Sequence, residues 1–102
     1  MAKRIDTNQP DLVALYRHAG CRVLHLHGLG KGAPDLLIGD PVSQRLALIE
    51  IKDGSKSESR RRLTPDEARF HAEWDGLPVF IVANDEDALG VLDSLREGEL
   101  TC

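Results

Sequence analysis

Apolar and polar positions change their spacing several times along the chain, and each change predicts a different element. Apolar residues recur at helical spacing in three segments, and short apolar or alternating runs typical of strands lie between them. The expected elements are helices 9–19, 65–75 and 85–97, and strands 21–27, 36–40, 45–52 and 79–83. The order α-β-β-β-α-β-α predicts an α/β fold, a mixed central sheet flanked by helices, in a single domain covering 1–102.

Local signals at the element ends refine this prediction. Asn8 is expected to cap the first helix, which ends at Gly20. Residues 64–67 read Thr-Pro-Asp-Glu, a capping box with proline in the first turn, and the helix that follows is expected to bury Phe70 and Trp74. The wholly apolar strand 79–83 is expected to be buried on both faces.

Two of the expected strands form a hairpin whose register brings two carboxylates together. With a turn at 41–44, counting back along both strands places Asp35 opposite Glu50. Carboxylates opposed at the roughly 5 Å of a cross-strand pair repel each other unless a cation lies between them. Lys52 follows two residues after Glu50 and therefore shares its face. Because Mg²⁺ prefers oxygen ligands, this pattern predicts a metal-binding carboxylate pair with a lysine beside it.

Charge and composition limit the possible partners. The net charge of −4 argues against binding to nucleic acid, but the acidic residues concentrate in 84–102, whereas 52–62 is a basic patch suited to phosphates. No apolar stretch is long enough to span a bilayer, and no signal peptide is visible. Cys21 and Cys102 do not make a disulfide framework. We therefore expect a cytoplasmic protein with no membrane partner.

These motifs resemble a known family. Pro34-Asp35 followed by Glu50-Ile51-Lys52 resembles the signature of the PD-(D/E)XK nuclease superfamily, whose restriction-endonuclease-like core is αβββαβ. The glycine-rich run before Pro34 and the segment 62–67 are similar to its VRR-NUC branch, particularly the small stand-alone phage or bacterial type that resembles Holliday-junction resolvases. The resemblance covers residues 4–95.

The resemblance implies the roles of the candidate site residues. Asp35, Glu50 and the backbone carbonyl of Ile51 would bind Mg²⁺ or Mn²⁺, and Lys52 would activate the attacking water or stabilise charge on the phosphate. Many relatives have a glutamate on the first helix, and here that position is Gln9, which can hydrogen-bond to metal-bound water but adds no charge. Asp6 and Asp11 are possible substitutes.

Other motifs have plainer explanations. The run 28–32 lacks the spacing of a Walker loop and precedes a strand, so we interpret it as a loop that borders the cleft. His25 and His27 are expected to share a strand face, but no further ligand completes a zinc site.

The predicted function is hydrolysis of DNA phosphodiester bonds by a metal-dependent endonuclease. The basic residues expected to contact the DNA backbone are Lys31, Lys56, Arg60, Arg61 and Arg62. By analogy with the family, the substrate is a four-way junction or other branched DNA, cut by a homodimer in a bacterial or phage-infected cell. The alternatives are a nuclease for duplex ends, nicks or flaps, a catalytically silent DNA-binding or assembly module, and a subunit that depends on a replication or repair partner.

Overall fold

The computed structural model describes residues 7–55 and 62–97, and their order of elements is the one predicted. The helices are α1 (Gln9–His18), α2 (Pro65–Glu73) and α3 (Asp85–Glu97), and a short 3₁₀ helix, η1 (His27–Leu29), follows the first strand. The strands are β1 (Arg22–His25), β2 (Leu36–Asp40), β3 (Arg45–Ile51) and β4 (Val79–Val82). None of the helices in the described residues is long and apolar enough to cross a membrane.

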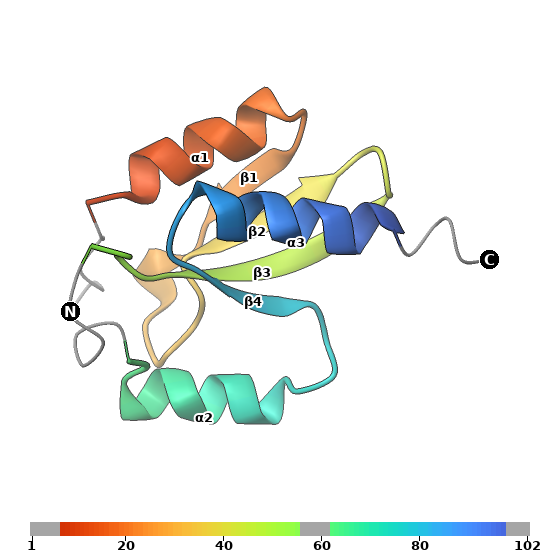
Figure 1. The fold of residues 1–102 in the computed structure, drawn as a ribbon. Coiled ribbons are helices and arrows are strands. Elements are labelled where there is room, and N and C mark those ends of the chain that lie inside the picture. The colour runs from red at the N-terminus through yellow and green to blue at the C-terminus, as the bar shows by residue number, and fades with distance from the viewer. Residues whose placement is uncertain (1–6, 56–61, 98–102) are drawn as a thin grey trace.

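The four strands form one mixed sheet in the order β1-β2-β3-β4. The first three strands are antiparallel neighbours, and β4 is parallel to β3 (Figure 1). The hairpin has the predicted register, in which Ile38 pairs with Ala47 and Asp40 with Arg45. The last pair towards the open end of the hairpin is Leu36 with Ile49, so the next positions outward are Asp35 and Glu50.

Helices α1 and α3 cover one face of the sheet, and α2 lies on the opposite side (Figure 1). Alternate residues of β2 and β3 point into the core beneath α1 and α3, as the period of a strand requires. The buried core consists of Leu12, Val13, Tyr16, Cys21, Leu36, Ile38, Ala47, Ile49, Ile51, Val82, Ala88, Val91, Leu92 and Leu95. Asp35, Glu50 and Lys52 occupy the positions between these core-facing residues. Their side chains therefore belong to the opposite face, on which α2 lies.

Several local predictions were wrong: two concern how much of the sheet is covered on the side away from α1 and α3, and one concerns where β1 ends. Strand β4 is an edge strand, and Ile81 is 49% exposed because no helix of the described residues packs over it. Trp74 is also exposed, and it stacks on the half-buried Phe70 within α2 instead of entering the core. Strand β1 ends at His25, so His27 lies in η1 and does not share a strand face with it.

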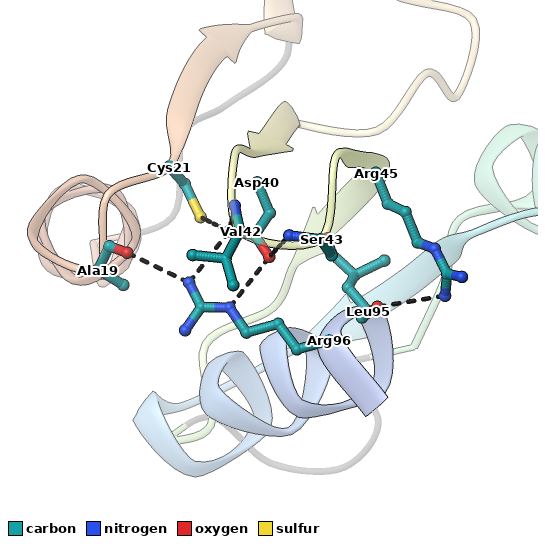
Figure 2. Close-up of polar contacts among 8 residues, drawn as sticks. All are labelled: Ala19, Cys21, Asp40, Val42, Ser43, Arg45, Leu95 and Arg96. Atoms are coloured by element: carbon teal, nitrogen blue, oxygen red, sulfur yellow. Dashed lines mark hydrogen bonds and ion pairs between the residues drawn. The ribbon is translucent and has the colours of Figure 1, made fainter. Parts of the chain in front are cut away.

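The turn end of the hairpin is held by Asp40, whose carboxylate is buried (Figure 2). It accepts hydrogen bonds from Arg96 Nε and Nη2, both at 3.0 Å, and from the backbone N–H groups of Val42 and Ser43. The Arg96 guanidinium is the main reason that the pKa of Asp40 is lowered to about 2. Arg96 also donates to the carbonyl of Ala19, so α1, α3 and the hairpin turn are joined at this end of the sheet.

Asn8 joins the opposite end. It occupies the predicted N-cap position of α1, but its side chain caps nothing. Instead, its Nδ2 donates to the carbonyls of Lys52 and Ala83, each at 3.1 Å. This contact ties the beginning of α1 to the chain where β3 and β4 end, and it brings the following residue, Gln9, to the same end of the sheet.

Candidate active site

Asp35 and Glu50 lie at the open end of the β2–β3 hairpin, and both are buried, with exposed fractions of 2% and 0%. Asp35 immediately precedes β2, and Glu50 is the penultimate residue of β3. Asp35 Oδ2 accepts a hydrogen bond of 2.7 Å from the backbone N–H of Ile51. The short bond holds the Asp35 carboxylate against the backbone of the Glu50-Ile51-Lys52 motif.

Lys52 lies between two carboxylates. Its Nζ is 3.8 Å from Glu50 Oε2 and only 2.7 Å from Glu67 Oε1. The lysine side chain is 12% exposed, and the two carboxylate side chains are almost fully buried. Charge-assisted hydrogen bonds of this length are among the stronger polar contacts in proteins, so Glu67 is the nearer and stronger partner of Lys52.

From the sequence, Glu67 was interpreted only as the second half of a capping box, and its contact with Lys52 was not predicted. The predicted capping box is present: Thr64 Oγ1 accepts from the N–H of Glu67, and Glu67 Oε1 accepts from the N–H of Thr64 at 2.9 Å. That local role accounts fully for a glutamate at this position. Only the tertiary structure shows that the same oxygen also accepts from Lys52, 15 residues earlier in the chain.

The glycine-rich loop packs directly against the first turn of α2. At Gly32 the backbone has φ +79°, and a Cβ there would lie 2.3 Å from the carbonyl oxygen of Asp66. No side chain larger than hydrogen fits at that distance unless the backbone moves. The loop before Asp35 therefore fixes the position of the helix turn that carries Glu67.

The oxygen donors at this end of the sheet suit a hard divalent cation. In the described part of the chain, no three His, Cys, Asp or Glu side chains converge as a metal site would require. The predicted donor set is different, because it combines two carboxylates with the backbone carbonyl of Ile51. Mg²⁺ commonly binds through one or two carboxylates and keeps several waters, so Asp35, Glu50 and Ile51 fit that ion better than they fit zinc.

Gln9 is buried on α1, and its exposed fraction is 2%. Its Nε2 lies 3.3 Å from His25 Nδ1, and within the described ranges no hydrogen-bond partner meets its Oε1. The side chain lines an open groove of about 490 Å³ together with Arg17, His25 and His27. Gln9 is thus paired with a histidine of the edge strand, a contact that sequence spacing did not indicate.

The predicted DNA-contacting residues are only partly described. Lys31 is exposed in the glycine-rich loop with φ 55°, and Arg62 is exposed just before α2. Lys56, Arg60 and Arg61 lie outside the described residues. The two described cations therefore lie in the segments that lead into Asp35 and into α2.

Comparison with known proteins identifies the fold. No protein-family model and no curated protein matches the chain. A solved structure described as "VRR_NUC domain" superposes on it with a TM-score of 0.62 and 23% sequence identity, over 86% of this chain and 97% of that chain. The resemblance noted from the sequence is therefore confirmed at the level of the fold: the chain has the α/β, restriction-endonuclease-like fold of a VRR_NUC domain.

Proposed function

We propose that the protein is a metal-dependent endonuclease that hydrolyses phosphodiester bonds of DNA. The observation that carries this proposal is the convergence of Asp35, Glu50 and Lys52 at one end of a sheet with the VRR_NUC fold. A buried cluster of carboxylates with a lysine is costly to fold, and such clusters gather at functional sites. The fold itself is a nuclease fold, which supports DNA as the substrate.

In this proposal, Asp35, Glu50 and the Ile51 carbonyl hold Mg²⁺ or Mn²⁺. When bound, the ion supplies a hydroxide-like nucleophile and offsets the negative charge that grows on the phosphate. Lys52 adds a compact positive charge beside the same phosphate. The hydrogen bond from Ile51 to Asp35 keeps that carboxylate in place. Gln9, whose Oε1 meets no hydrogen-bond partner among the described residues, would hydrogen-bond to metal-bound water.

DNA would be positioned by contacts to its backbone. Lys31 borders the site in the glycine-rich loop, and Lys56, Arg60, Arg61 and Arg62 belong to the segment between Lys52 and α2. The N-terminus of α2 adds the positive end of a helix dipole. Contacts to phosphate position a duplex without reading its sequence, so recognition would depend on the shape of the DNA.

The proposed substrate is a four-way junction or other branched DNA, and the proposed assembly is a homodimer. One candidate site makes one cut, so paired cuts in the two strands would need a second copy. The setting would be the cytoplasm of a bacterial or phage-infected cell, with access to replication or repair proteins.

The test is cleavage of labelled four-way junction, flap and linear duplex DNA with Mg²⁺, Mn²⁺ or EDTA. Glu50→Ala removes a proposed ligand, and Glu73→Ala, an exposed glutamate at the end of α2, is the matched control. Paired cuts in the junction that require metal and Glu50 but not Glu73 are the expected result.

Two other results would change the proposal. Metal-dependent cutting of flap or linear duplex alone would retain the chemistry and discard the junction. Binding of branched DNA in EDTA, with no cutting in any metal, would contradict the enzyme and leave a DNA-binding module.

A further inference from the structure

Lys52 is shared unequally by its two carboxylate partners. The 2.7 Å contact with Glu67 is a hydrogen bond, whereas the 3.8 Å separation from Glu50 is too long to be one. Lys52 directly follows β3 and lies two residues after Glu50, on the same side of the chain, so the lysine could otherwise approach Glu50 directly. Of these two partners, the lysine therefore lies nearer to the one that is farther from it in sequence.

Glu67 is well placed to hold the lysine there. Its exposed fraction is 3%, and its Oε1 is also bound by the N–H of Thr64, so the carboxylate has a fixed position independent of Lys52. The helix turn that carries it is in turn packed against Gly32. Lys52, by contrast, has a flexible four-carbon stem and takes the position that its partners allow.

An ammonium group and a divalent cation compete for the same carboxylate. A lysine bound directly to Glu50 would occupy oxygen lone pairs that a metal ion needs and would add like charge beside it. We propose that Glu67 is a positioning residue that holds Lys52 off Glu50, so that Glu50 is able to take a divalent cation. This inference rests on the proposed function, because it assumes that Glu50 binds the metal.

The test is direct binding of Mn²⁺ to the whole protein without DNA, measured by electron paramagnetic resonance titration. Four proteins form a double-mutant cycle: the natural sequence, Glu67→Gln, Lys52→Met, and the two changes together. Glu67→Gln should weaken Mn²⁺ binding about tenfold when Lys52 is present, and by less than about twofold when residue 52 is methionine. The size of this coupling measures how far Glu67 acts through the lysine.

Glutamine keeps an oxygen that can accept from Thr64, so Glu67→Gln retains the cap of α2, and circular dichroism and thermal unfolding verify that each variant folds. Asp66→Asn is the matched control, since it removes the same charge from the same helix turn at a residue that pairs with the exposed Arg69 and not with Lys52. It should change Mn²⁺ binding by less than about twofold.

Three outcomes would overturn the inference, and they are distinguishable. Equal weakening by Glu67→Gln in both backgrounds would mean that Glu67 acts through its charge alone. No weakening in either background would mean that it only caps α2. Absence of Mn²⁺ binding by the natural sequence, or binding that survives both Asp35→Asn and Glu50→Gln, would overturn the proposed metal site and this inference with it.

Discussion

The two ends of the β2–β3 hairpin both bury carboxylates beside a cation, but they pair their charges differently. At the turn end, one carboxylate, Asp40, meets one guanidinium through two hydrogen bonds of 3.0 Å. At the open end, Lys52 lies between two carboxylates, those of Glu50 and Glu67. Asp35 lies beside them, held by the backbone of Ile51. The turn end pairs one carboxylate with one guanidinium, whereas at the open end one lysine contacts two carboxylates.

The way in which each carboxylate is paired distinguishes a structural carboxylate from a candidate catalytic one. Burial alone does not distinguish them, because Asp35 and Asp40 are both 2% exposed. The bidentate contact with Arg96 and the two backbone donors stabilise the ionised form of Asp40, and this is why its pKa falls to about 2. A carboxylate stabilised in this way serves the fold. Asp35 and Glu50, at the open end of the hairpin, offer oxygen donors of the kind that suit a divalent cation.

The sharpest test of this comparison is an Asp→Asn substitution at each end of the hairpin, beginning with Asp35→Asn at the open end. Asparagine retains an oxygen that can accept from Ile51, so the thermal midpoint should change little, but it removes a proposed metal ligand. The expected loss of cleavage is about 10³-fold, the scale on which loss of a group that stabilises the transition state acts. Rates of junction cleavage in Mg²⁺ and the unfolding midpoint are the two measurements. A large fall in stability would place Asp35 with the structural carboxylates.

The reciprocal substitution at the turn end is Asp40→Asn. It leaves Arg96 without its charged partner and weakens four hydrogen bonds. Because Arg96 is partly solvated, we expect a loss of about 2 kcal/mol in the free energy of unfolding, below the range for fully buried pairs. Urea denaturation measures the loss, and the cleavage rate per folded molecule should not change. A strong loss of cleavage without destabilisation would contradict the division between the two ends.

The pH dependence of the unfolding free energy tests the contribution of the Asp40–Arg96 pair separately. The pKa of Asp40 is about 2 in the folded protein and about 3.9 in an unfolded chain. A lowered folded pKa gives stability that is complete above about pH 4 and is lost as the pH falls towards 2. The difference in unfolding free energy between the natural sequence and Asp40→Asn should therefore shrink by most of its ~2 kcal/mol over that interval. A difference that stays constant would show that the carboxylate charge contributes nothing.

Much of the fold could be predicted because its signals are local. The apolar spacing of α3, the Thr64–Glu67 capping box and the register of the hairpin all follow from neighbouring residues, and the structure has them. The exposure of Trp74 and Ile81 could not be predicted in the same way. Apolar composition indicates that a residue is suited to a core, but only the tertiary arrangement decides whether another element covers it.

The candidate site likewise contains residues that local patterns predict and contacts that only the tertiary structure reveals. Asp35, Glu50 and Lys52 were identified from strand parity and the spacing of one hairpin, and the structure brings them to one end of the sheet. The contact between Lys52 and Glu67 joins two elements whose relative position no local pattern sets. The contact of Gln9 with His25 is of the same kind. For Glu67 the helix cap concealed the tertiary contact, and for Gln9 the sequence predicted a place near the metal but not the contact with His25.

The smallest predicted effect concerns the loop that positions the open end. Gly32 and Gly30 both have positive φ, +79° and +68°, but only Gly32 lies against α2, and a Cβ at Gly30 would meet nothing within 4 Å. Replacing either with alanine strains the backbone, by about 1 kcal/mol or more at Gly32. The cost is about 1–3 kcal/mol at Gly30, whose φ +68° and ψ −164° lie in a region open essentially only to glycine. Gly32→Ala should additionally displace the first turn of α2 and lower cleavage about tenfold, since small misplacements of a site reduce rates by that order or more. Cleavage and thermal unfolding of the two variants, compared side by side, separate backbone strain from the close approach. Equal effects of the two variants on cleavage would show that the contact between Gly32 and α2 does not position the site.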